Sequence, residues 1–227
     1  MCKLLLCQNP AGKCKEYFCT VRGRLAFLAR VRYTFNVMRI SGGAWCGRKL
    51  KAPSGDAVRP TQDRVREAIF SMLMTVTPDS TFLDLYAGSG AVGFEALSRG
   101  AKSATWVEKE TRHVAVLKEN LLLLGTDKGE VVCSEVMRWV KGSGRGRAFD
   151  VIYADPPYQQ AHEMGFGDLM KALAEQQVIA KRGFFIAEMG ERQAAEAVPG
   201  WTVLRDRTYG HTRVVLYRKE DVDVCIE

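Results

Sequence analysis

The strongest constraint on the fold is a regular alternation of short apolar segments with segments whose apolar residues recur at helical spacing. Such alternation predicts a mostly parallel sheet with helices on both faces, an α/β fold. The chain ends differently, because the apolar segments 201–205 and 212–217 flank a turn at Tyr209-Gly210 and predict an antiparallel hairpin. The expected strands are 81–85, 104–108, 130–133, 149–154 and 183–188, and the expected helices are 61–75, 91–98, 111–124 and 166–175.

Charge and periodicity divide the chain near Met38. Residues 1–37 hold seven Lys or Arg side chains against one acid, and four of the seven cysteines, but only weak hydrophobic periodicity. Three interpretations stay open: a start codon placed too early, an organelle-targeting leader, and a basic arm. We favour a mis-set start or a dispensable, disordered arm. A hairpin over 38–58, a main domain over 59–220 and a tail over 221–227 would follow.

Composition excludes several classes of protein. No uncharged apolar run approaches the roughly 18 residues that a membrane-spanning helix needs. The cysteines form no C-x-x-C pair and the three histidines do not cluster, so we expect no metal site and reduced thiols in a cytoplasm. The formal net charge is +7. A basic segment beside a nearly neutral body is typical of proteins that dock on a phosphate backbone, although a merely solvated surface has the same composition.

A glycine-rich loop joins the predicted strand 81–85 to the predicted helix 91–98. Gly88, Gly90 and Gly93 satisfy G-x-G-x-x-G in the strand–turn–helix context in which that pattern binds nucleotides. Glycines let the backbone approach a ligand closely, and a helix N-terminus offers free N–H groups. Plain strand-to-helix turns show the same pattern, so it is weak by itself.

Two acids accompany this loop. Asp84, just before the turn, could accept hydrogen bonds from a ligand amine or hold the loop. Glu108 ends the next strand 20 residues after Gly88, where nucleotide-binding folds place an acid that accepts ribose hydroxyl protons. Loop and acids together predict a nucleoside-containing ligand, and they leave both dinucleotides and S-adenosylmethionine open.

The segment Asp155-Pro156-Pro157-Tyr158 directly follows the predicted strand 149–154. The prolines restrict the backbone and remove two N–H donors, so the Asp155 carboxylate and the Pro156 carbonyl can both act as acceptors. Tyr158 offers a ring on which a flat base can stack. This arrangement suits an exocyclic amine, whose two N–H groups donate to the acceptors while its lone pair faces an electrophilic methyl group.

These motifs, in this order, resemble the class I S-adenosylmethionine-dependent amino-methyltransferases. Two further stretches, ISGGAWCGRKL at 40–50 and RPTQDRVREAIF at 59–70, closely resemble the RsmD family of bacterial 16S ribosomal RNA guanine-N2 methyltransferases. The match runs from about Arg39 to Tyr217. It implies a Rossmann-like fold with a mostly parallel seven-stranded sheet, an antiparallel C-terminal strand and a small N-terminal β-hairpin that contacts RNA. It also implies methyl transfer to the N2 amine of a guanine.

The resemblance assigns roles to residues at matching positions. The methyl donor would lie against Asp84, Ala87, Gly88, Gly90, Glu108 and an adenine loop of Ser134, Glu135 and Val136, with Thr61 closing over it. Asp155, Pro156, Pro157 and Tyr158 would hold the guanine. RNA would meet Arg48, Lys49, Arg59, Arg64 and Arg66, with Asp63 bracing the arginines. Glu135 departs from the pattern, which has Asn or Asp there. The implied partner is 16S ribosomal RNA in an assembled or assembling small subunit. We expect a cytoplasmic monomer that uses S-adenosylmethionine, releases S-adenosylhomocysteine and needs no metal.

Other functions share some of these motifs. A DNA adenine methyltransferase, or one acting on another nucleic-acid amine, would use the same tetrapeptide chemistry. A protein-glutamine methyltransferase usually has Asn at the position of Asp155. A catalytically inactive RNA-binding assembly factor would not need three intact acids at 84, 108 and 155. A nicotinamide dehydrogenase would share the glycine pattern, but the Asp-Pro-Pro-Tyr loop and the antiparallel end disfavour it.

Overall fold

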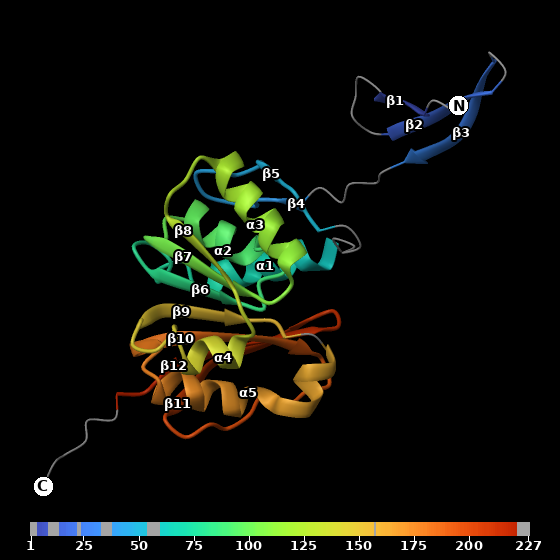
Figure 1. Cartoon of the computed structure of the whole chain (residues 1–227). Helices are drawn as coiled ribbons and strands as arrows, with labels where there is room; N and C mark the ends of the chain where they lie inside the picture. The colour runs from blue at the N-terminus through green and yellow to red at the C-terminus, as the bar shows by residue number, and fades with distance from the viewer. Residues whose placement is uncertain are drawn as a thin grey trace, which may run out of the picture. The chain divides into compact units, whose positions relative to one another are not determined.

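The computed structural model describes residues 4–8, 14–21, 24–32, 38–53, 60–156 and 158–221. The chain divides into two compact units, Met1–Val37 and Met38–Glu227. In the first unit, strands β1 (Leu4–Gln8), β2 (Cys14–Val21) and β3 (Arg24–Arg32) form an antiparallel sheet in that order (Figure 1). The sequence did not predict these strands, because their apolar and basic residues alternate too irregularly to give a clear period of two. That Met38 is the working start stays a prediction.

The second unit is built on a seven-stranded sheet. Its order is β11-β12-β10-β9-β6-β7-β8, and β12 alone runs in the direction opposite to that of the other strands. The predicted mostly parallel sheet with an antiparallel C-terminal strand is confirmed. The strands are β6 (Thr81–Leu85), β7 (Ser103–Glu108), β8 (Gly129–Cys133), β9 (Phe149–Ala154), β10 (Ile179–Gly190), β11 (Trp201–Tyr209) and β12 (Thr212–Lys219).

Helices cover both faces of this sheet (Figure 1). One apolar cluster joins one face to α1 (Pro60–Met72), α2 (Ala91–Ser98) and α3 (Thr111–Leu124), and it contains Ile69, Phe94 and Leu117. A second cluster joins the other face to α4 (Val136–Lys141) and α5 (Tyr158–Glu175). Apolar side chains at helical spacing therefore pack where the periodicity predicted, since burial of that stripe is what stabilises each helix. No helix in the described ranges is both long and apolar enough to cross a bilayer.

Two helices differ from expectation. The sequence did not predict α4, because a helix of six residues shows too little of the helical period. The segment α5 begins at Tyr158 rather than at 166, but Gly165 interrupts it with non-helical angles (φ 49°, ψ 169°). The part after this kink corresponds to the predicted helix 166–175.

The predicted hairpin near the start of the second unit is present. Strands β4 (Met38–Arg39) and β5 (Lys49–Leu50) pair antiparallel. The backbone N–H of Lys51 donates to the side chain of buried Asn120 on α3, and Asn120 donates back to the Lys51 carbonyl, at 2.9 and 3.0 Å. The hairpin is therefore attached to α3, and it also contacts α2.

Candidate active site at the carboxyl ends of the strands

The donor-side acids lie on one face of the sheet, at its carboxyl-terminal edge. Asp84 on β6 pairs with Trp106 on β7 and with Tyr153 on β9, so these side chains share a face. Glu108 lies two residues beyond Trp106 and therefore points to the same side. From β6 the chain adds β7 and β8 on one side, and it then returns to add β9 and β10 on the other side. Parallel α/β folds bind ligands outside the strand ends at the point where the strand order changes in this way.

The same face continues toward β10. Tyr153 pairs with Ile186 on β10, so Glu188, two residues further, lies on the side of Tyr153. Asp155 directly follows the end of β9 and is two residues beyond Tyr153. The structure thus brings together the predicted acids Asp84, Glu108 and Asp155 and adds Glu188, which the sequence analysis missed. Glu188 could have been recognised in the sequence as an acid near the end of an apolar strand.

Backbone N–H groups bind the two acids nearest the glycine loop. Asp84 accepts a hydrogen bond from the N–H of Gly93 at 2.9 Å. Glu108 accepts from Gly88 at 2.7 Å and from Glu110 at 2.8 Å, so it joins the loop to the beginning of α3. The contact with Gly93 supports one of the two functions considered for Asp84, holding the loop against the beginning of α2, and a hydrogen bond from a ligand amine stays a prediction. Each carboxylate oxygen has two lone pairs, so Glu108 can still accept hydroxyl protons.

The glycine pattern is explained by close packing in this loop. Gly90 has φ 75°, a left-handed conformation that a β-carbon disfavours, and it directly precedes α2. Trp106 donates from Nε1 to the Gly90 carbonyl at 3.2 Å, and a β-carbon at Gly93 would overlap that indole. Trp106 therefore requires a glycine at 93, whereas the left-handed backbone and the side chain of Leu117 require one at 90.

Burial raises the pKa of Asp84 from its ordinary value of 3.8 to about 8. The Gly93 hydrogen bond acts in the opposite direction, and the charges of Glu108 and Glu188 raise the pKa further. A raised pKa means that the folded protein binds this proton more tightly than the unfolded chain does. The stabilising effect is therefore complete below the unfolded pKa of 3.8 and is lost as pH rises through about 8.

We expect the free energy of unfolding to decline between about pH 4 and about pH 8, with Asp84 contributing a slope of up to about 1.4 kcal/mol per pH unit. Asp84→Asn should remove this part of the slope, because the amide does not titrate. Urea unfolding of both proteins across that pH range measures the difference. Parallel curves for the two proteins would contradict the expectation.

Asp155, Tyr153 and Glu188 form a second group of polar side chains. Tyr153 is 5% exposed and donates from its hydroxyl to Oε2 of Glu188 at 2.6 Å. Asp155 keeps a solvent-accessible side, yet desolvation by the surrounding protein raises its pKa well above the usual range, and the charges of Glu188 and Asp84 add to that rise. Burial also raises the pKa of Glu188, against the Tyr153 hydrogen bond, which lowers it. Groups that donate hydrogen bonds or carry positive charge would be favoured beside these acids.

The predicted adenine loop is a helix N-terminus. Glu135 directly precedes α4, and its carboxylate accepts from the N–H groups of Met137 and Arg138 at 2.9 and 2.7 Å. Val136 is 3% exposed and packs in the core. Glu135, which stands where Asn or Asp was expected, therefore caps this helix, and both of its carboxylate oxygens accept backbone hydrogen bonds.

Tyr86 is a neighbour of this loop that the sequence analysis missed. Burial raises its pKa to about 12, and the charge of Glu135 raises it further. Its backbone is left-handed, with φ 58°, in the turn between Asp84 and the glycine loop. Strained non-glycine residues of this kind are concentrated at functional sites. Ser134 lies on the other side of Glu135, with its hydroxyl bonded to the Glu135 carbonyl at 3.1 Å.

The predicted RNA-binding residues fall into two groups. Lys49 and Arg64 are exposed, and exposed Arg48 donates to the carbonyls of Leu123 and Leu124 at the end of α3, at 2.8 and 3.5 Å. Arg66, by contrast, is 4% exposed, so its guanidinium does not face solvent. We therefore leave Arg66 out of the RNA-contact surface. Sequence alone could not show this, because the partner that buries it lies 29 residues away.

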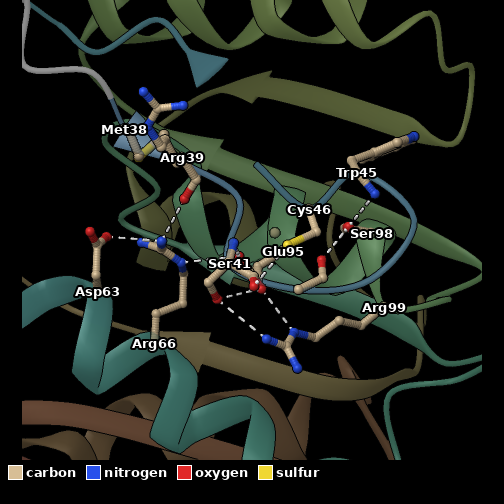
Figure 2. A network of polar contacts seen from close by, with 12 residues as sticks. Met38, Arg39, Ser41, Trp45, Cys46, Asp63, Arg66, Glu95, Ser98 and Arg99 are labelled. Carbon is tan, nitrogen blue, oxygen red and sulfur yellow. Dashed lines mark hydrogen bonds and ion pairs between the residues drawn. The ribbon is translucent and has the colours of Figure 1, made fainter. Parts of the chain in front are cut away.

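That partner is Glu95, a fully buried carboxylate on α2 (Figure 2). It accepts hydrogen bonds from Arg66 at 3.2 Å, from Arg99 at 2.8 Å, and from both the backbone N–H and the hydroxyl of Ser41 at 2.8 Å. Arg66 also donates to Asp63 at 2.9 Å, in keeping with the bracing role expected of that acid. The network ties the hairpin, α1 and α2 together.

Some predicted residues lie outside what the structure describes. These are Arg59 and Pro157, and the side chains of Thr61, in α1, and Tyr158, at the start of α5. Pro156 is partly buried beside Asp155, and Ala87 is buried in the glycine loop. Within the described ranges, no group of three or more His, Cys, Asp or Glu side chains is arranged to hold a metal ion.

Known proteins resemble this chain over most of the second unit. A family model described as "Conserved hypothetical protein 95" matches residues 38–218. YlbH of Bacillus subtilis (strain 168) is 36% identical over 185 residues, which cover 80% of this chain and 99% of that protein. Ribosomal RNA small subunit methyltransferase D of Escherichia coli (strain K12) is 34% identical over 184 residues, which cover 81% and 90%. The solved structure of yhhF from Escherichia coli has a TM-score of 0.73 at 34% identity and covers 81% of this chain and 98% of that one. This chain belongs to the RsmD family, in which the relatives from Escherichia coli and Haemophilus influenzae carry the name ribosomal RNA small subunit methyltransferase D.

Proposed function

We propose that this protein transfers a methyl group from S-adenosylmethionine to the exocyclic N2 amine of a guanine in small-subunit ribosomal RNA. The observation that carries the proposal is the convergence of Asp84, Glu108 and Asp155 on one face at the strand ends. The names of the relatives support ribosomal RNA as the substrate. We further propose that it acts as a monomer in the cytoplasm, on RNA in an assembled or assembling small subunit.

The donor side of the site fits a nucleoside with a positive charge. Glu108 lies at the strand end with lone pairs free for ribose hydroxyls, and the glycine loop beside it is thin enough for close approach. Burial raises the pKa of Asp84, and a positively charged donor beside it would favour its ionised form, so the acid and the cation would stabilise each other. Ala87, Gly88, Gly90, Ser134 and Thr61 complete the proposed donor site. Because the carboxylate of Glu135 caps α4, we propose that the donor meets the backbone of this loop rather than that carboxylate.

The target side holds an amine. The Asp155 carboxylate and the Pro156 carbonyl accept its two N–H groups, while Tyr158 stacks on the base and Pro157 restricts the loop. An amine so held is more tetrahedral, and its lone pair is less delocalised into the ring. S-adenosylmethionine supplies a methyl group on a positively charged sulfur, so transfer forms an N–C bond, breaks an S–C bond and releases one amine proton. Burial raises the pKa of Asp155, a bound cationic donor favours its ionised form, and in this proposal the ionised carboxylate receives that proton.

RNA binds, in this proposal, over the exposed basic residues of the hairpin and α1. The predicted contacts that this proposal keeps are Arg48, Lys49, Arg59 and Arg64. To these we add two further exposed residues of the hairpin segment, Arg39 and Lys51. Since Glu95 ties the hairpin to α2 and α2 begins at the glycine loop, the basic surface is held in a constant position relative to the strand ends. The target guanine must leave its stack to reach them.

The test is a transfer assay with radiolabelled S-adenosylmethionine on unmodified small ribosomal subunits, naked 16S RNA and genomic DNA. We expect labelled N2-methylguanosine from a ribosomal sample after digestion to nucleosides. Labelled N6-methyladenine from DNA would overturn the substrate assignment. Absence of both label and donor binding would favour an inactive assembly factor.

A further inference from the structure

Glu188 has a carboxylate that one protein hydrogen bond orients and that can still bind a ligand. Its Oε2 accepts the Tyr153 hydroxyl at 2.6 Å, which fixes the orientation of the carboxylate. From the described residues, its other oxygen accepts no hydrogen bond. The side chain is only partly buried, and its charge is felt by both Asp155 and Asp84. It therefore offers an oriented acceptor next to the residue that we propose holds the amine.

Guanine and adenine would interact differently with the Glu188 carboxylate. On its pairing edge, guanine presents the N2 amine next to an N1–H, which is another donor. Adenine presents its N6 amine next to an N1 lone pair, which is an acceptor. Enzymes that take a base out of its stack read this edge by hydrogen bonds. A second carboxylate beside the first would therefore stabilise guanine and repel adenine.

We propose that Glu188 is a specificity-determining residue, which accepts a hydrogen bond from the guanine N1–H while Tyr153 holds its carboxylate in place. This inference rests on the proposed function, because it assumes that the amine of a guanine is bound at Asp155. It explains how one site with an Asp-Pro-Pro-Tyr loop can distinguish guanine from adenine.

The experiment uses 2-aminopurine, which keeps the 2-amino group but has a lone pair at N1 and lacks the N1–H. 16S RNA is ligated from pieces so that the mapped target position carries either guanine or 2-aminopurine, and it is reconstituted into small subunits if naked RNA is not methylated. The measured quantity is the ratio of kcat/KM for guanine to kcat/KM for 2-aminopurine. Wild type, Glu188→Gln and Tyr153→Phe are compared. Glu191→Gln is the control, because Glu191 is exposed and pairs with His211 on the surface.

In Glu188→Gln we expect the preference for guanine to fall by roughly 10- to 100-fold, because the amide can donate to the N1 lone pair of 2-aminopurine. Tyr153→Phe should lower the preference in the same direction by less, and Glu191→Gln should leave it unchanged. Donor binding, measured by calorimetry, should remain within a few-fold of wild type.

The proposal is wrong if Glu188→Gln slows both bases equally, because a purely structural residue would do that. If Glu188→Gln does not fold, an unchanged preference in active Tyr153→Phe would likewise overturn it. A wild-type protein that makes no N2-methylguanosine from any ribosomal sample would instead refute the proposed function itself.

Discussion

Asp155→Ala should lower the rate of methyl transfer by roughly 100-fold or more while leaving the affinity for S-adenosylmethionine within a few-fold. The carboxylate contributes a charge-assisted hydrogen bond to the amine, and it also orients the lone pair. Both contributions act mainly on the transition state, so kcat should fall more than KM rises. Single-turnover assays with unmodified small subunits measure the rate, and calorimetry measures donor affinity.

Two companion variants separate the chemistry from the fold. Asp155→Asn keeps one acceptor oxygen and should keep part of the activity. Asp168→Ala, at an exposed position on α5, should behave as wild type. Normal turnover by Asp155→Ala would refute the proposed mechanism, because the mechanism requires the Asp155 carboxylate to accept a hydrogen bond from the target amine.

Glu95→Ala should reduce the free energy of unfolding by about 3–5 kcal/mol, since it removes the one fully buried carboxylate that Arg66 and Arg99 share. Arg66 is 4% exposed and Glu95 is fully buried, so water cannot replace the lost bonds. The N–H of Ser41 would lose its partner as well, and the hairpin would be held less firmly on α2. Urea unfolding measures the loss, and amide hydrogen exchange over residues 38–50 should accelerate.

The matched control is Glu119→Ala. Glu119 also pairs with a basic residue of the hairpin segment, Lys51, at 2.7 Å, but both side chains are more than half exposed. Exposed pairs contribute about 0–1 kcal/mol because water screens them. If both variants lose the same stability, burial of the Glu95 network is not what holds the hairpin.

Local patterns predicted the elements and part of the site. The strands β6 and β9 and the helices α2 and α3 have the predicted bounds, because each is long enough to show its period and is bounded by turn residues. The glycine loop and Asp84 could be located because their motif is contiguous, and Glu108 could be located because it ends the next predicted strand. Glu188 could not, since its importance depends on pairing between β9 and β10. The resemblance placed Glu135 in the adenine loop, which stays a prediction, and its hydrogen bonds show in addition that it caps α4.

By itself, the sequence determined the alternation of strands and helices from β6 to β12 except for α4, the chemistry available at each loop and the resemblance to a methyltransferase family, because all of these are carried by neighbouring residues. Only the tertiary structure decided that Arg66 is buried against Glu95, that Asp84 holds the glycine loop, and that Glu188 stands beside Asp155. The physical reason is that burial and pairing depend on residues far apart in the chain. The free energy of a charged side chain depends on what surrounds it, not on its position in a motif.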